Sequence, residues 1–471
     1  MSLSELLLMR HEWALVVAIL VLLLLELGLS AKRRKNIIPF ATLLIAAITF
    51  IGFLPAEQGS LFGGMYITDP LRIMMKNILN LGVTLIFLQS GAWLRTDANK
   101  ERITEFYMLL ISSLIGIHYM ISSGHFLMFY LGLELTTIPV AALASYEQFK
   151  SKSAEAGIKL ILSSAFSSAI LLFGLSIMYG ALGNLYFSEL HFSGSLLTVL
   201  GFLFFFSGIA FKISIVPFHL WTADVYEGSP TNVTSYLSVI SKGAAVFILI
   251  LLLFTVFQSI HAVWKNVLYA TSVFTMTAGN LFAIRQQNLK RFLAFSSIAQ
   301  AGFILLGMVS GTAMGMASVV YFILVYVFSN LAAFGVVQAV EQHTGKVTIS
   351  DYDGFYQTNP KLSLAMMLAL FSLAGIPPLA GFFGKFFLFT AVAEGGFYGL
   401  LLIAVLNAVI SLYYYLLVVK AMFINKNETP IGHFTSDVAM RISLVVCVVG
   451  IIITGFYGPV FEYIKSLCLG I

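Results

Sequence analysis

Long apolar stretches separated by short polar segments dominate this chain. Residues 13–31, 37–55 and 243–257 are nearly free of charge, and about 20 residues of helix cross the hydrocarbon core of a bilayer. The apolar runs do not alternate at a period of two, which argues against the strands of a membrane barrel. Because backbone groups in lipid must be satisfied within helices, the pattern predicts an all-α integral membrane protein.

Apolar stretches of spanning length number about 14. We expect them at 12–31, 37–55, 70–94, 104–121, 125–145, 157–181, 195–218, 231–256, 261–284, 290–310, 313–340, 361–393, 397–423 and 438–463. The longest connecting loop, about 341–360, is polar and too short to fold as a soluble domain. We therefore expect residues 1–471 to form a single polytopic membrane domain.

Basic residues gather in alternate loops. On one side they are Lys32, Arg33, Arg34, Lys35, Arg95, Lys100, Arg102, Lys150, Lys152, Arg285, Lys290, Arg291, Lys346, Lys361, Lys420 and Lys426. The other side holds little beyond Arg10, Lys265 and Lys465. Since loops rich in lysine and arginine stay in the cytoplasm, an even number of spans predicts both termini on the outer, periplasmic side of a bacterial inner membrane.

Composition agrees with the pattern and narrows the chemistry. Hydrophobic residues make up 59% and charged residues 10% of the 471, whereas a soluble domain has about 25% charged residues. Cys447 and Cys468 are too few for an iron–sulfur site and have no zinc spacing. The eight histidines are scattered, and no P-loop or glycine-rich nucleotide fingerprint is present. We therefore expect no bound cofactor, no metal and no nucleic-acid partner, and a driving reaction that takes place elsewhere.

Several charged residues fall inside the predicted spans. The basic ones are Arg72, Lys76, Lys159, Lys212, Lys242 and Lys385. Glu134 is the clear buried acid, and Glu26, near a helix end, is the weaker case. A charge at a helix centre costs roughly 2.5–3.5 kcal/mol, so such residues face a protein interior or a hydrated cavity. A structural or snorkelling ion pair is the alternative for each, above all for Arg72 and Lys76, which lie a turn apart near a helix start.

Prolines interrupt two of the spans that carry lysine. Lys212 stands in FKISIVPFHLW with Pro217, and Lys385 stands in GIPPLAGFFGKFFLF with Pro377 and Pro378. Proline inside a helix kinks or breaks it, and broken spans are tolerated at membrane depth where they line a hydrated cavity. Two such spans in corresponding positions of two halves indicate a transporter built from inverted repeats.

The charges predict a proton path. Burial disfavours the charged form of a lysine and a nearby carboxylate favours it, so a Glu134–Lys212 pair would set whether that lysine holds its proton. Lys242, between small residues, would be the next acceptor. His219 could relay protons near neutral pH, although a histidine near a helix end can also be a plain interfacial residue. Hydroxyl groups that could position water belong to Thr136, Ser163, Ser164 and Ser241.

At these residues the chain resembles the antiporter-like membrane subunits of respiratory complex I. The matching stretches are FYLGLELTTIP with Glu134, EAGIKLILSSAFSSA with Lys159, FKISIVPFHLWTADVYEGSPTNVTSYLSVISKGA with Lys212, His219 and Lys242, NLKRFLAFSSIAQAG with Lys290, and FSLAGIPPLAGFFGKF with Lys385. The resemblance covers most of the chain from about residue 65 to 425, and the long central stretch is the most specific.

Within that family the chain is most similar to the N-type branch, the counterpart of mitochondrial subunit 2. It ends soon after its last span, whereas the L-type branch continues into a long lateral helix. Lys385 stands where the M-type branch has a glutamate, and TEFYMLLISSLIG is similar to the N-type sequence.

The resemblance implies two inverted five-helix repeats, roughly 104–256 and 261–423, each with a broken helix. It also implies a lateral axis of Glu134, Lys212, Lys242 and Lys385, with Lys159 beside Lys212. The chain would be a non-redox subunit of a proton-translocating NADH:quinone oxidoreductase, driven by quinone reduction in a neighbouring part of the complex. NADH, FMN, iron–sulfur clusters and quinone would be bound by partner membrane and peripheral subunits, and the lipid bilayer would surround the chain.

Two alternatives stay open from the sequence. One is a subunit of a multisubunit sodium/proton antiporter or of a membrane-bound hydrogenase, which would share the fold. The other is a scaffold that has kept the fold and lost conduction, against which the intact set of four axis residues argues.

Overall fold

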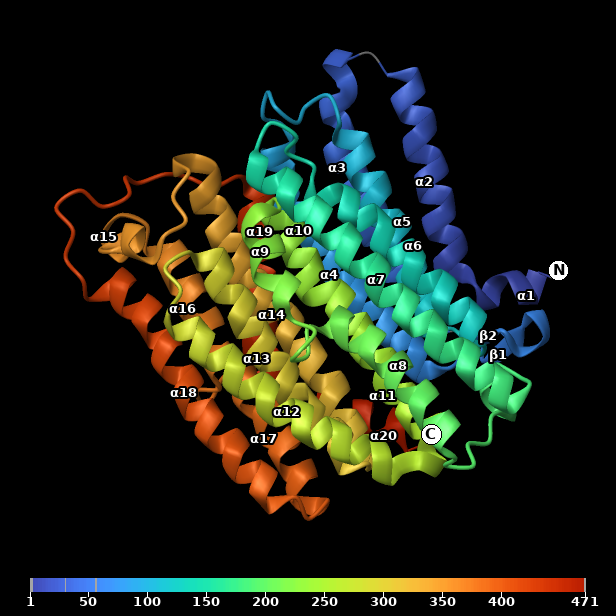
Figure 1. Cartoon of the computed structure of the whole chain (residues 1–471). Coiled ribbons are helices and arrows are strands. Elements are labelled where there is room, and N and C mark those ends of the chain that lie inside the picture. Colours follow the sequence, from blue (N-terminus) through green and yellow to red (C-terminus); the bar gives the residue numbers. More distant parts are fainter. Residues whose placement is uncertain (1–2, 30, 56, 470–471) are drawn as a thin grey trace. The chain divides into compact units, whose positions relative to one another are not determined.

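The computed structural model describes residues 3–29, 31–55 and 57–469 and is almost entirely helical (Figure 1). Thirteen helices in the described residues are long and apolar enough to cross a membrane. A further predicted span, 361–393, is divided between α16 (Pro360–Ala374) and α17 (Ala380–Glu394). Two short strands, β1 (Gly59–Leu61) and β2 (Tyr66–Thr68), pair antiparallel as a hairpin. The all-α membrane architecture with about 14 spans is confirmed.

The chain folds as two compact units. The first comprises Met1–Lys212, Gly228–Val233 and Ile240–His261, and the second comprises Ile213–Glu227, Thr234–Val239 and Ala262–Ile471. Helices of the first unit are α1 (Leu3–Leu8), α2 (Arg10–Gly28), α3 (Ile37–Gly52), α4 (Pro70–Leu94), α5 (Ile103–Ile121), α6 (Phe126–Ala144), α7 (Ser151–Leu182), α8 (Leu196–Ile213) and α11 (Lys242–Thr255).

Helices of the second unit are α12 (His261–Ile284), α13 (Leu289–Ser310), α14 (Ala313–Thr344), α15 (Phe355–Thr358), α16, α17, α18 (Tyr398–Phe423), α19 (Val438–Phe456) and α20 (Pro459–Cys468). The two units share along the chain the helices α9 (Leu220–Gly228) and α10 (Thr231–Ser235) and the π-helical turn Tyr236–Ser241. Short 3₁₀ helices lie at Ala31–Asn36, Phe62–Gly64, Phe187–Glu189, Gln258–Ile260 and Ile349–Tyr352.

Helix ends follow the local sequence. The Asp69 side chain accepts a hydrogen bond from the Arg72 backbone N–H at 2.8 Å, and Pro70 opens α4. The Asn288 side chain caps α13 in the same way. Such caps satisfy backbone N–H groups that have no partner within the helix. Gly183 ends α7 with a φ of 72°, a conformation that glycine adopts without strain.

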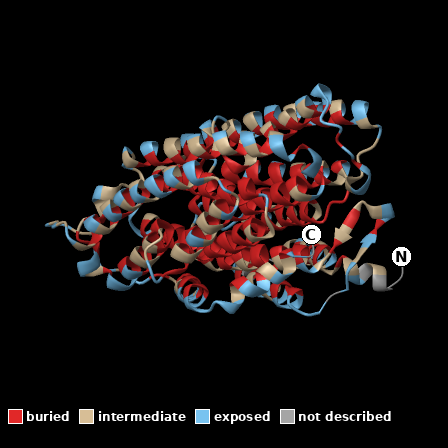
Figure 2. Cartoon of the chain, turned by 90° about the horizontal axis from the view of Figure 1, so that it is seen from below, coloured by how far each residue is buried: buried red, intermediate tan, exposed pale blue. Residues whose placement is uncertain are grey.

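Burial separates central helices from peripheral ones. The apolar windows of α13 and α14 are fully buried, and α14 packs against α13, α16, α17 and α19 within the second unit. In α18 and α19 only 39% of the window is buried. Figure 2 shows such helices with buried residues on one side and exposed residues on the other. Many of the exposed residues are large and apolar, for example Leu24 and Leu402, as expected of a surface in contact with lipid tails.

Two spans end earlier than expected. The helix predicted at 195–218 stops at Ile213, and Ser214 follows with a φ of 67°, in the left-handed region that a residue with a side chain rarely adopts. The helix predicted at 438–463 stops at Phe456. Pro459 then opens the separate helix α20, because proline suits the first turn of a helix and not its interior.

Candidate functional site

Glu134 and Lys212 are linked in the first unit through a serine of α7. Glu134 lies in α6 and its Oε1 accepts a hydrogen bond from the Ser168 hydroxyl. Ser168 also lines a small cavity whose wall includes Lys212, near the end of α8. The Glu134 carboxylate interacts electrostatically with Lys212. The structure therefore brings the predicted acid and the predicted lysine into one polar environment.

This Lys212 cavity has a volume of about 10 Å³, near the size that holds one water molecule. Its polar wall carries three serines of α7 and one threonine of α6, and its lining residues are Leu133, Thr137, Ser164, Ser167, Ser168, Leu171, Gly208, Phe211 and Lys212. The Ser167 hydroxyl donates to the Gly208 carbonyl at 3.1 Å. Hydroxyl groups beside a lysine can hold a water that takes up or supplies a proton.

Glu134 and Lys159 differ from expectation in their surroundings. Glu134 was expected to be buried, but its residue is only partly buried in this chain. The Lys159 ammonium lies 2.6 Å from Glu155 Oε1, one turn earlier in α7, and 40% of its side chain is exposed. Among the described residues, the lining of the Lys212 cavity does not include Lys159.

Lys242 is almost fully buried, with 3% of its surface exposed. It opens α11 directly after the π-helical turn Tyr236–Ser241. A π-helical turn inside a span disturbs the regular hydrogen-bond ladder and is frequent at functional sites. Ser241, expected to position water, is also buried.

The first helix break separates α8 from α9 and contains Pro217. In the second unit the Val216 N–H donates to the Thr275 hydroxyl at 3.0 Å, so a side chain replaces the missing helical partner. His219 is partly buried at the end of this break, and its carbonyl accepts the Thr222 N–H at 3.0 Å.

Lys385 occupies the second helix break. Pro377 and Pro378 lie between α16 and α17, and Lys385 is 4% exposed in the second turn of α17. Its ammonium donates to the carbonyl of Ala374, the last residue of α16, at 2.9 Å and to the Ser411 hydroxyl of α18 at 3.4 Å. The last carbonyls of a helix lack helical partners and carry partial negative charge. The break therefore holds the buried ammonium with carbonyl and hydroxyl dipoles.

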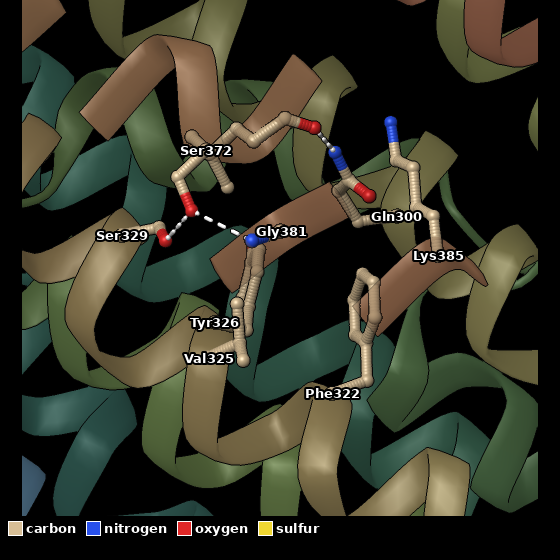
Figure 3. A pocket seen from close by; sticks show the side chains of 9 residues that line it. Gln300, Phe322, Val325, Tyr326, Ser329, Ser372, Gly381 and Lys385 are labelled. Carbon is tan, nitrogen blue, oxygen red and sulfur yellow. Dashed lines mark hydrogen bonds between the residues drawn. The ribbon is translucent and has the colours of Figure 1, made fainter. Parts of the chain in front are cut away.

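The Lys385 cavity has a mostly apolar surface with a few polar groups in its wall (Figure 3). Its volume is about 10 Å³, and its lining residues are Gln300, Phe322, Val325, Tyr326, Ser329, Ser372, Leu373, Gly381 and Lys385. The Ser372 hydroxyl contacts the Ser329 hydroxyl at 2.7 Å and accepts the Gly381 N–H at 3.1 Å. Gln300 donates to the Leu373 carbonyl at 2.9 Å. The broken end of α16 is thus held by side chains from α13 and α14.

A hydrogen-bonded group continues from this cavity within the second unit. The Tyr326 hydroxyl contacts the Ser238 hydroxyl at 3.2 Å, and Asn330 donates to the same serine oxygen at 2.7 Å. Sequence reasoning did not single out these residues, nor Gln300 and Ser411. Uncharged polar residues in a span are too common to select, although Tyr326, Ser329 and Asn330 share one helix at spacings of three and four residues.

The most deeply buried acid is one that the sequence reasoning missed. Glu12 is 1% exposed, at the start of α2, and pairs with Lys76 of α4 at 2.5 Å. Glu26, treated as the second candidate, is 25% exposed and pairs with Arg34 at 2.8 Å. Lys76 is therefore in a fully buried ion pair, and its partner lies 64 residues earlier in the chain.

Cys447 and Cys468 are buried free thiols. Within the part of the chain that the structure describes, no group of three or more histidine, cysteine, aspartate or glutamate side chains is arranged to hold a metal ion.

Comparison with solved structures shows the same fold in membrane complexes. A chain of respiratory complex I from Thermus thermophilus with bound aureothin superposes with a TM-score of 0.81 at 29% identity, covering 96% of this chain and 98% of that chain. A chain of the Mrp complex from Dietzia sp. superposes with a TM-score of 0.86 at 18% identity, covering 99% and 97%. At that identity the second likeness concerns the fold alone.

Sequence comparison is more specific. The profile of the family described as NADH:quinone oxidoreductase/Mrp antiporter, TM, matches residues 123–411, which include Glu134, Lys212, Lys242 and Lys385. A protein of Phocaeicola vulgatus named NADH-quinone oxidoreductase subunit N is 50% identical and covers 100% of both chains. A protein of the same name from Moorella thermoacetica is 39% identical over 92% of each chain. The chain belongs to the NADH:quinone oxidoreductase/Mrp antiporter family of membrane proteins.

Proposed function

We propose that the chain is the N-type membrane subunit of a bacterial NADH:quinone oxidoreductase and that it translocates protons. The full-length likeness to relatives that carry this subunit's name supports the assignment. NADH, FMN, the iron–sulfur clusters and quinone would be bound by partner subunits, and this chain would act without redox chemistry of its own. Its partners would be the other membrane and peripheral subunits of that complex.

The observation that carries proton translocation is the setting of Lys385. Its ammonium is held by the Ala374 carbonyl and the Ser411 hydroxyl, and no acidic side chain forms an ion pair with it in the described residues. The carbonyl and hydroxyl dipoles stabilise the charged ammonium less than a carboxylate would. Lys385 can therefore lose its proton without leaving a buried carboxylate unpaired. A water in the adjoining cavity would accept that proton.

Glu134 would control Lys212 in the first unit. A carboxylate near the ammonium favours the protonated lysine, and weakening that interaction favours proton release. Because Glu134 is partly exposed on this chain, a neighbouring membrane subunit could change the interaction directly. Quinone reduction elsewhere in the complex would then act on this pair through the neighbouring subunit. Lys242, buried at the start of α11, would exchange protons between Lys212 and Lys385, with Lys159 and His219 in supporting roles.

The two broken helices support a repeat organisation. We infer that 104–256 and 261–423 are inverted repeats, each contributing one proline-broken helix with its lysine. The basic loops further support a topology with both termini on the periplasmic side of the inner membrane.

A sodium/proton antiporter subunit is the second candidate, because the matching family profile also describes Mrp antiporters. Purification of the tagged chain from native membranes separates the two. Our proposal expects co-purifying flavin, iron–sulfur and NADH-oxidising subunits, with NADH-driven acidification in proteoliposomes. Sodium-dependent proton exchange in a preparation without those subunits would contradict it.

A further inference from the structure

A second cluster of buried ionisable groups lies among the N-terminal helices of the first unit, before the segment that the family profile matches. The Lys76 ammonium lies 2.5 Å from Glu12 Oε1 and donates to the Tyr66 hydroxyl at 3.1 Å. The Tyr66 hydroxyl in turn contacts Glu12 Oε2 at 3.1 Å. All three side chains are at most 1% exposed. We call this group, with the two histidines described next, the N-terminal cluster.

Two buried histidines adjoin the ion pair. His11 Nε2 contacts Asn77 Oδ1 at 3.1 Å, and His118 Nε2 contacts Asn80 Oδ1 at 2.9 Å. The two imidazole rings meet edge to face with centroids 5.8 Å apart, and both histidines interact electrostatically with Lys76. The cluster therefore joins a carboxylate, an ammonium, a phenol and two imidazoles, all of which bind and release protons.

Charged and titratable side chains face the cluster from α2, β2, α4 and α5. The titratable and charged side chains that face it are Arg10, His11 and Glu12 of α2, Tyr66 of β2, Asp69, Arg72 and Lys76 at the start of α4, and His118 and Tyr119 of α5. Arg72 pairs with Asp69, and Arg10 donates to the Gly52, Leu54 and Pro55 carbonyls. These outer charges are thus engaged, and Glu12 is the counter-ion of Lys76.

A line of polar side chains runs from the N-terminal cluster along α4 into the bilayer. Arg72, Lys76, Asn80 and Thr84 recur every four residues and so share one face of α4. At 1.5 Å per residue, Lys76 lies about 9 Å, Asn80 about 15 Å and Thr84 about 21 Å from the start of that helix. Thr84 continues the polar line by contacting the Thr49 hydroxyl of α3 at 2.9 Å.

Two buried atoms in this line have no protein partner. His118 Nδ1 and Asn80 Nδ2 make no hydrogen bond among the described residues. Buried polar atoms are nearly always satisfied, by protein or by ordered water. If the Glu12–Lys76 ion pair had a structural role alone, it would not need the His118 and Asn80 side chains beside it. A path for protons would use both side chains.

The hairpin β1–β2 covers the outer end of the cluster. Tyr66 of β2 bonds both Glu12 and the Leu8 carbonyl, and it packs with Met9 and Leu61. Glu12 is only the third residue of α2, so it lies near one end of this span, beneath the hairpin. The carboxylate is therefore placed where protons can enter or leave.

We propose that Glu12, Tyr66, Lys76, His11 and His118 form a second proton-binding site, which exchanges protons with the side of the membrane where α2 begins. A proton that binds the Glu12 carboxylate removes the counter-ion of Lys76. The ammonium then passes a proton towards the imidazoles, so that one O–H bond forms on Glu12, one N–H bond breaks on Lys76 and one N–H bond forms on a histidine. This inference rests on the proposed proton translocation.

The test compares two double variants in the assembled complex. Glu12→Gln with Lys76→Met replaces the buried pair by neutral groups of similar size, and Glu26→Gln with Arg34→Met does the same to the more exposed pair near the other end of α2. Neutralising a buried pair as a whole is usually tolerated structurally. We expect both complexes to assemble and oxidise NADH, and only the first to lose proton release per NADH and to change its pH profile.

Normal proton yield and an unchanged pH profile in the assembled first variant would overturn the inference and leave a structural ion pair. If that variant fails to assemble, Tyr66→Phe decides, because it removes one hydroxyl and keeps the packed ring. A partial loss of proton release per NADH in Tyr66→Phe would support the site, and normal release would refute it. Lys385→Met, measured in parallel, separates the inference about the N-terminal cluster from the proposed function. Normal pumping in Lys385→Met would refute proton translocation by this chain itself.

Discussion

The close approach of α17 to the end of α16 makes Gly381→Ala a sharp test of the Lys385 site. A Cβ atom at Gly381 would lie 1.7 Å from the Ser372 carbonyl oxygen and 2.5 Å from its carbon. Carbon–oxygen contacts are normally at least about 3.3 Å, so the end of α16 must move by about 1.5 Å. Overpacking usually lowers the free energy of unfolding by about 1–3 kcal/mol. Because the obstacle here is backbone, which moves less easily than a side chain, we expect a loss of about 3 kcal/mol.

That movement would reach the lysine. Ala374, whose carbonyl accepts the Lys385 ammonium at 2.9 Å, lies two residues beyond Ser372. A shift of about 1.5 Å exceeds the distance range of a hydrogen bond, so the ammonium would lose its main acceptor. We expect an assembled complex with a lower melting midpoint and a reduced proton yield per NADH.

Gly180→Ala is the matched control, because a Cβ atom at Gly180 of α7 meets nothing within 4 Å. Alanine should stabilise that helix by about 0.5–1 kcal/mol. Both variants are compared by thermal unfolding of the purified complex and by proton release in proteoliposomes. An assembled Gly381→Ala complex that melts and pumps like Gly180→Ala would refute the proposed tight packing at the break.

Lys212, Ser168 and Arg291 can each be tested by a single substitution. Lys212→Ala should lower proton release per electron, measured in membrane vesicles, with only a secondary loss of assembled complex; a normal ratio would remove this lysine from the path. Ser168→Ala removes a hydrogen bond to the acid that acts on Lys212, so proton yield should fall less than in Lys212→Ala, and an equal or larger fall would contradict a supporting role. Arg291 donates to Asp224 at 2.7 Å and to Glu227 at 2.9 Å in a partly exposed site. Arg291→Gln should therefore destabilise the subunit by about 1 kcal/mol or less. Loss of the assembled complex on native gels would contradict this and show that the link holds the first helix break in place.

Features with a local cause could be predicted from the sequence. The spans follow from apolar length, and the interruptions lie beside Pro217 and Pro377 because proline inside a helix kinks or breaks it. Proline alone does not decide the matter, since Pro139 lies inside the continuous helix α6. Departures also had local causes, such as Pro459, which ends the last predicted span early.

Pairings between distant residues could not be predicted. Glu12 of α2 meets Lys76 of α4 because both helices pack against α3 and α5, and nothing in either segment alone specifies that meeting. Lys385 is held by the Ala374 carbonyl and Ser411, which are a backbone atom and a common residue type. Helix rotation is equally invisible, since nothing in the sequence of α7 specifies that 40% of the Lys159 side chain is exposed. Its pairing with Glu155, four residues earlier, is by contrast a local pattern. These outcomes depend on how helices rotate and pack, which hydrophobic length does not determine.

The central claim is that Lys385 carries a proton at the broken end of α16, and the ratio of protons released to NADH oxidised tests it most directly. That ratio is measured in proteoliposomes for Lys385→Met, with Lys361→Met, an exposed lysine at the start of α16, as the control. We predict a lowered ratio in Lys385→Met and a normal ratio in Lys361→Met, both in fully assembled complexes. A normal ratio in assembled Lys385→Met would contradict the account.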